Sequence, residues 1–183
     1  MLPWHMIHTV AMDASSLTSV ALLTILLAEV YNVHPQHLSM QPNLESMLAV
    51  ADACLLIGDN GMLADDQELR VLDLGRAWRR LTGLPFVYAL WLGEPQRVTP
   101  KLVAALQTAK DYGETQFDAI AVEEARRLNC PAAVCLDYMS NVMDYGLGED
   151  HLRGLEMFRE KVFANNLLGQ SRLSGAQPLR ILE

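Results

Sequence analysis

Four hydroxyl side chains stand close together near the start of the chain, at Ser15, Ser16, Thr18 and Ser19. They follow an apolar run that ends at Asp13, a pattern that predicts a strand, a turn and the first turn of a helix. The first backbone N–H groups of a helix have no partner within it, and with the hydroxyls they favour a bound anion. A carboxylate fits better than a phosphate, because the glycines that allow close pyrophosphate approach are missing. The alternative is that Ser15 or Ser16 only caps the helix.

A second candidate site lies in the run LLIGDNG over residues 55–61, where an apolar strand pattern ends at Gly58 and Asp59 follows. Glycine allows a ligand to approach the backbone closely, and Asp59 either accepts a hydrogen bond from a ligand hydroxyl or caps the next turn. A third stretch, TGLPFVYALW over residues 82–91, begins with a Gly-x-Pro turn and continues as a strand pattern. Simple core packing is the alternative for this third stretch.

Metal and cofactor signals are weak. His5 with His8, and His34 with His37, have a spacing compatible with a metal, but no third ligand accompanies either pair. P-loop, GxSxG, HExxH and GxGxxG motifs are missing. The three cysteines show no CxxC spacing, which favours free thiols. We therefore expect neither a metal nor a cofactor, and the sequence assigns no catalytic residue.

The elements that must position these residues alternate over the first half of the chain. Strands are expected at residues 8–13, 37–40, 53–58, 70–75 and 84–92, and helices at 18–31, 43–50 and 77–81. Alternation of strands and helices predicts an α/β fold with a mostly parallel sheet that is covered on both faces.

The second half of the chain is expected to be helical. Thr99 and Pro100 form a cap and first-turn proline, and helical patterns cover residues 100–110, 114–129, 132–145 and 149–166. Several of these helices are amphipathic, with Ile120 and Val122 among the apolar positions of one of them. Their apolar faces need a sheet or other helices to cover them, and the sequence does not obviously supply that cover.

Composition limits the classes of function. The 183 residues carry a formal net charge of −8, with 51% hydrophobic and 20% charged residues, which predicts a folded protein. No basic stripe is available for nucleic acid, and an anionic ligand must be held by local hydrogen-bond donors. The apolar runs are too short to span a bilayer and no secretory signal is recognisable, so we expect a cytoplasmic protein without membrane contact.

The order of several segments adds a resemblance to a known family. The run VAMDASSLTSVALL is followed by ADACLLIGD, LDLGRAWRRLTGLPFVYALW and YGLGEDHLRGLEMF, and this series resembles chorismate dehydratase of the futalosine route to menaquinone. The resemblance implies a type II periplasmic-binding-protein-like fold. It implies one complete α/β lobe over residues 1–92 and, over 93–183, the mainly helical C-terminal part of the other lobe.

The same resemblance implies a function and a set of contacts. The enzyme would be a cofactor-free lyase that removes water from chorismate to give 3-[(1-carboxyvinyl)oxy]benzoate. The hydroxyl-rich helix start would face a carboxylate of this small-molecule substrate. The substrate-binding residues implied are Ser15, Ser16, Thr18, Ser19, Gly58, Asp59, Pro85 and Phe86.

Two departures from the family pattern matter. Leu17 stands where the family is expected to have arginine, which removes a positive charge from the anion site. The family's opening third is expected to be missing, which would leave apolar helix faces exposed and favour self-association. The sibling dihydroxynaphthoate synthase, a non-catalytic carboxylate-binding lobe and an inactive fragment are the alternative functions.

Overall fold

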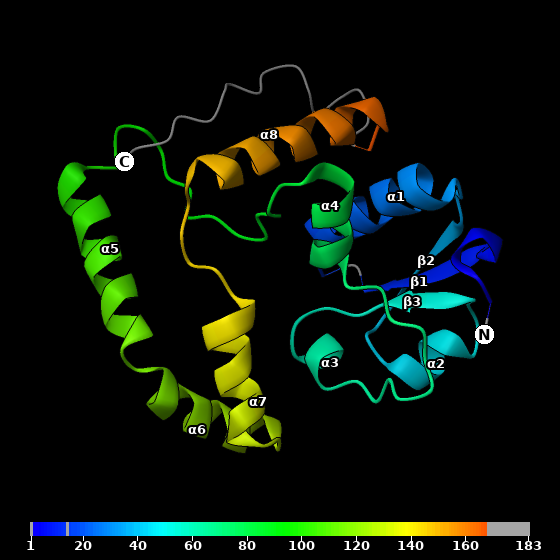
Figure 1. The fold of residues 1–183 in the computed structure, drawn as a ribbon, viewed down its shortest axis with the longest axis horizontal. Helices are drawn as coiled ribbons and strands as arrows, with labels where there is room; N and C mark the ends of the chain where they lie inside the picture. The colour runs from blue at the N-terminus through cyan, green and yellow to red at the C-terminus, as the bar shows by residue number, and fades with distance from the viewer. Residues whose placement is uncertain (1, 14, 168–183) are drawn as a thin grey trace. The chain divides into compact units, whose positions relative to one another are not determined.

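The computed structural model describes residues 2–13 and 15–167 (Figure 1). These residues divide into two compact units. Residues 2–13, 15–88 and 148–167 belong to the first unit, and residues 89–147 belong to the second. Among the described residues, no helix is both long and apolar enough to cross a bilayer.

The first unit is built on a three-stranded parallel sheet. Strands β1 (Thr9–Asp13), β2 (Gln36–Met40) and β3 (Ala53–Leu55) lie in the order β2-β1-β3. Strand β1 is therefore central, and it is buried from its second residue onwards. These strands confirm the expected parallel α/β character of the first half of the chain.

Helices cover both faces of this sheet. The helical elements of the first unit are η1 (Trp4–Met6), α1 (Leu17–Tyr31), α2 (Leu44–Leu48), α3 (Gly58–Met62), α4 (Leu74–Thr82) and α8 (Glu149–Ala164). The chain moves outward from β1 to β2 and then back past β1 to β3. Right-handed crossovers in opposite directions place their helices on opposite faces. In Figure 1, α1 accordingly lies on one side of the sheet and α2 on the other.

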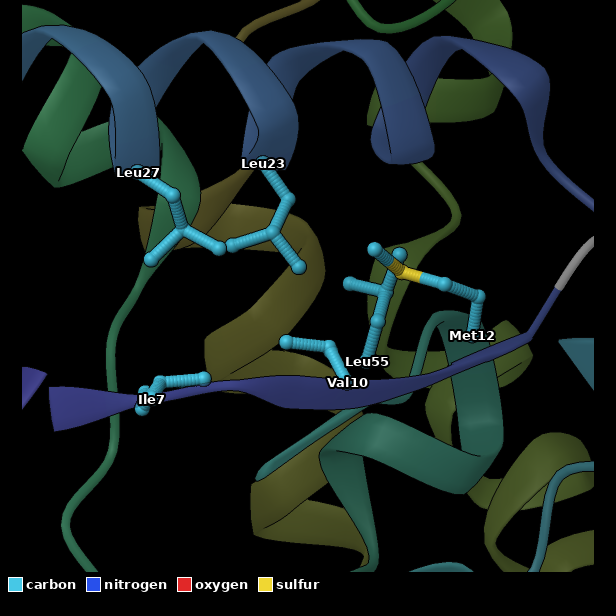
Figure 2. Close-up of a cluster of buried hydrophobic side chains, with 6 residues drawn as sticks. All are labelled: Ile7, Val10, Met12, Leu23, Leu27 and Leu55. Carbon is cyan, nitrogen blue, oxygen red and sulfur yellow. The ribbon is translucent and has the colours of Figure 1, made fainter. Parts of the chain in front are cut away.

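The main hydrophobic core lies between β1 and α1 (Figure 2). Leu23 and Leu27 are one helical turn apart and project from α1 towards the sheet. They meet Val10 and Met12, which alternate onto the same face of β1. Ile7 and Leu55 complete this cluster of buried side chains.

A second core lies on another face of α1. Leu22 and Leu26 pack with Trp78 of α4 and with Phe86, and all four side chains are buried. The ring of Phe158 from α8 meets Trp78 edge-on, with centroids 5.9 Å apart. Leu23 and Leu27 face the sheet, whereas their neighbours in the sequence, Leu22 and Leu26, face α4 and α8. Helix α1 is therefore held between the sheet on one side and these two helices on the other.

Two expected strands are not present. Residues 70–73 are irregular and end at Asp73, whose side chain caps α4 by accepting from the Arg76 N–H at 2.6 Å. Residues 84–92 are also irregular. Pro85 has no N–H to offer a neighbouring strand, and Phe86 is committed to the aromatic core. Phe86 is therefore a core residue, which is the alternative that the sequence analysis gave for this stretch.

The second unit is helical, as expected. It contains α5 (Pro100–Glu114), α6 (Phe117–Leu128), α7 (Ala132–Asp137) and the π-helical turn η2 (Tyr138–Val142). The small core between α6 and α7 is formed by Ala121, Ala125 and Cys135. Ile120 and Val122 of α6 are exposed, so this part of the expected apolar face has no cover among the described residues. A face of small alanines packs here because it lets α7 approach closely.

Candidate functional site

A pocket of about 750 Å³ opens at the carboxyl ends of the three strands. All of its lining residues belong to the first unit. They are Asp13 and Ser15 after β1, Ser39, Met40, Gln41 and Pro42 at the end of β2, and Ile57, Gly58 and Asn60 after β3. Three loops therefore meet at one edge of the sheet, because the strands are parallel.

The position of the pocket follows from the topology. The loop after β1 leads to α1 on one face of the sheet, and the loop after the neighbouring β2 leads to α2 on the other. Adjacent loops that diverge in this way leave a crevice, and open α/β sheets bind their ligands at such points. In the strand register, Asp13 lies opposite Met40, which brings the two loops together at the pocket.

The hydroxyl-rich segment forms the N-terminus of α1 beside this pocket. Ser16 is the N-cap, and its Oγ accepts from the Ser19 N–H at 3.2 Å, while its carbonyl accepts from the Val20 N–H. The N–H groups of Leu17 and Thr18 have no acceptor among residues 2–13 and 15–167. This end of α1 thus offers a positive dipole end and donors that an anion can use.

The structure brings some of the expected site residues together and leaves others apart. Ser15 and Gly58 line the pocket. Ser16, Thr18 and Ser19 lie in the adjoining cap and first turn of α1. Ser19 is buried, and the Ser16 hydroxyl accepts from the Ser19 N–H and donates to Ser19 Oγ.

The remaining expected residues lie outside the pocket lining. Asp59 is exposed in the first turn of α3 and does not line the pocket. Phe86 lies in the aromatic core, and Pro85 packs its carbonyl against Gly154 of α8. These placements leave the assignment of Asp59, Pro85 and Phe86 as substrate contacts a prediction.

Four polar or acidic pocket residues were missed by the sequence reasoning. They are Asp13, Ser39, Gln41 and Asn60. The available signal was the end of each strand, because the carboxyl ends of parallel strands meet at one edge. Ser39 and Gln41 follow from that rule once residues 37–40 are recognised as a strand.

The polar lining is free to bind a ligand. In the described part of the chain, the side chains of Ser15, Ser39, Gln41 and Asn60 make no hydrogen bond. None of the described lining residues is a lysine or arginine, so a carboxylate here would be held by hydroxyl, amide and backbone donors. No cluster of three or more metal-binding side chains occurs within the described ranges.

A nearby thiol is not suited to chemistry. Cys54 lies in β3 and is half-buried. Burial raises the pKa of the Cys54 thiol, so the reactive thiolate is disfavoured. This side chain therefore belongs to the packing of the sheet.

The fold and pocket define a parallel α/β protein with a polar pocket at the switch point of its sheet. Within that class, the chain belongs to the menaquinone biosynthesis family, whose model matches residues 2–164. It is 34% identical over 169 residues to chorismate dehydratase of Thermus thermophilus, a match that covers 82% of this chain and 61% of that relative. The chain thus spans less than two thirds of the length of this relative.

Proposed function

We propose that this chain acts as a chorismate dehydratase, a lyase that converts chorismate to 3-[(1-carboxyvinyl)oxy]benzoate in the futalosine route to menaquinone. The observation that carries the proposal is its 34% identity to the chorismate dehydratase of Thermus thermophilus. The pocket at the switch point of the sheet supports it, because it offers uncharged donors suited to an organic acid.

We also propose that the fold is of the type II periplasmic-binding-protein kind. The order β2-β1-β3 with helices on both faces is the beginning of a doubly wound lobe. In this proposal, residues 1–92 form one lobe, against which α8 packs, and helices α5, α6 and α7 belong to a second lobe. A ligand would lie against the carboxyl edge of the sheet, where the pocket opens.

The proposed contacts place one substrate carboxylate at the N-terminus of α1. The N–H groups of Leu17 and Thr18 and the hydroxyls of Ser15 and Thr18 are the donors for it. A charge at a helix N-terminus contributes about 0.3–2 kcal/mol, and each hydrogen bond to a charged group about 1.5–3 kcal/mol. These magnitudes suffice for binding without a lysine or arginine in the pocket lining.

The proposed reaction depends more on how the protein positions the substrate than on strong acid or base groups. A proton leaves the ring carbon that carries the enolpyruvyl ether, the neighbouring hydroxyl leaves as water, and the ring becomes aromatic. Because aromatisation supplies much of the driving force, holding the ring and both carboxylates in place is the main task of the protein. No histidine, cysteine or lysine lines the pocket in the described residues, and we assign the proton to a substrate carboxylate or to a residue outside the pocket lining.

The direct test incubates the purified chain with chorismate and follows the product by absorbance and mass. We expect a product lighter than chorismate by one water. Thr18→Val should raise KM by about tenfold, which corresponds to the loss of one charge-assisted hydrogen bond. Thr108→Val, on exposed α5, is the matched control and should leave KM unchanged.

Three other outcomes distinguish the alternatives. Saturable chorismate binding without turnover would favour a non-catalytic carboxylate-binding lobe. This alternative matters because the chain matches only 61% of the length of its relative. Turnover of the dihydroxynaphthoate synthase substrate in place of chorismate would favour the sibling enzyme. If the protein shows neither chorismate binding nor turnover, the proposed activity does not belong to this chain.

A further inference from the structure

A buried carboxylate borders the pocket, outside the residues that the sequence singled out. Asp13 ends β1, is only 3% exposed and lines the pocket. Its Oδ1 accepts from the Ser15 N–H at 3.0 Å, and this is its one side-chain hydrogen bond to the described residues. Its Oδ2 therefore has no partner within the described part of the chain.

The pocket is the space from which a ligand can reach this side chain. Asp13 is one of the residues that line the pocket, although only 3% of its surface is exposed.

The chemistry of this oxygen selects its ligand. A carboxylate oxygen accepts hydrogen bonds and repels other anions, so it suits a donor and opposes a second carboxylate. No group of three metal-binding side chains surrounds it in the described residues, which leaves a hydroxyl or other N–H or O–H donor as its ligand. A buried polar group without a partner is costly, and a donor from the ligand removes that cost.

We propose that Asp13 accepts a hydrogen bond from the ring hydroxyl of a hydroxylated carboxylic acid and thereby distinguishes substrate from dehydrated product. This inference rests on the proposed function, since dehydration removes that hydroxyl. The substrate carboxylate lies at the α1 N-terminus, and the hydroxyl lies at Asp13 Oδ2. The product has no donor at this position and leaves an anionic oxygen unpaired beside its own negative charge, so it binds more weakly and is released.

Neighbouring residues support this division of the pocket. Ser15 lines the pocket and donates its N–H to Asp13, so it separates the acceptor Asp13 from the donors of α1. Ser39 lies one residue before Met40, which ends β2 and is the register partner of Asp13, and the Ser39 hydroxyl is without a partner among the described residues. Ser39 lines the same pocket and adds a hydroxyl group to it.

The test measures binding by calorimetry for two matched pairs of acids. One pair is chorismate and 3-[(1-carboxyvinyl)oxy]benzoate, and the other is 3,4,5-trihydroxycyclohex-1-ene-1-carboxylate and unsubstituted cyclohex-1-ene-1-carboxylate. In each pair the protein should bind the hydroxylated member at least about tenfold more tightly. Asp13→Asn keeps the shape and the acceptor for Ser15, but presents an N–H donor to the pocket. It should reduce that preference to about threefold or less, while Asp66→Asn, an exposed change of the same charge, should retain it.

The outcomes separate this inference from the proposed function. Equal binding of both members by the unmodified protein, binding of neither, or a preference that survives in Asp13→Asn would overturn it. If Asp13→Asn does not fold, the preference of the unmodified protein decides alone. Preference for the trihydroxy acid without turnover of chorismate would keep the hydroxyl contact and reject the dehydratase. Turnover that falls in Asp13→Asn with both dissociation constants unchanged would make Asp13 a base and reject the inference.

Discussion

Asp52 and Thr9 are 43 residues apart in the chain and hold each other through reciprocal hydrogen bonds. The Asp52 Oδ2 atom accepts from the Thr9 N–H at 2.9 Å and from the Thr9 hydroxyl at 3.0 Å, and it also accepts from the His8 N–H. The Asp52 N–H donates in return to Thr9 Oγ1. These bonds fix the start of β1 to the segment that leads into β3, and so set the register of the two strands.

This contact predicts a pH dependence of stability. The backbone hydrogen bonds from His8 and Thr9 lower the pKa of Asp52 below its usual value. A carboxyl group with a lowered pKa in the folded state contributes stability above its unfolded pKa and loses it as the pH falls through the folded pKa. We therefore expect Asp52→Asn to lower the urea midpoint at neutral pH and to weaken the loss of stability on acidification. Asp66→Asn, whose side chain makes no hydrogen bond within the described residues, should change neither.

The cap of α1 predicts a separation between stability and binding. Ser16→Ala removes the acceptor of the Ser19 N–H and should reduce the free energy of unfolding by about 1 kcal/mol. Ser16→Asp restores an acceptor and should recover most of that stability. Ser15→Ala should leave stability almost unchanged, because the Ser15 hydroxyl makes no bond within the described part of the chain, yet it should weaken chorismate binding. Equal unfolding midpoints for Ser16→Ala and the unmodified protein would contradict the capping role.

Two glycines predict opposite responses to alanine. A Cβ at Gly154 of α8 would lie 2.2 Å from the Pro85 carbonyl oxygen, whereas one at Gly113 of α5 would meet no atom within 4 Å. Gly154→Ala should therefore cost about 1–3 kcal/mol through overpacking. Gly113→Ala should be neutral or stabilise by up to about 1 kcal/mol, since glycine is a poor helix former. Chemical unfolding of both variants gives the comparison, and equal stabilities would refute the close approach of α8 to residue 85.

Local signals made much of the fold predictable. Asn43, Thr99 and Ser16 each cap a helix as their residue type suggests, and the consecutive apolar residues of β1 mark it as a buried strand. The pattern failed where tertiary packing decides. Residues 84–92 form an apolar run typical of a buried strand, but Pro85 lacks the N–H that strand pairing needs. Phe86 packs instead against the rings of Trp78 and Phe158.

The site was only partly predictable, for a geometric reason. The hydroxyl run identifies the end of β1 because it is local in sequence, and Ser15 indeed lines the pocket. Asp13 and Ser39 come together through the pairing of β1 with β2, which no short motif reveals. Asp13 also reads as an ordinary strand end in the sequence. Only its burial and its unfilled oxygen single it out.

The exposed apolar residues of the second unit predict self-association. Helix α5 has no buried residue, and Trp91 and Leu92 are 86% and 73% exposed. Adjacent large apolar side chains of this exposure are uncommon on monomers and favour contact with another molecule. We expect a concentration-dependent oligomer in analytical ultracentrifugation, and Trp91→Ser with Leu92→Ser should weaken it by about tenfold or more, since about 1.4 kcal/mol of apolar burial suffices. Val71→Ser, an equally polar change at an exposed residue of the first unit, should have little effect. A monomer at every concentration tested would show that these side chains are tolerated in water without a partner.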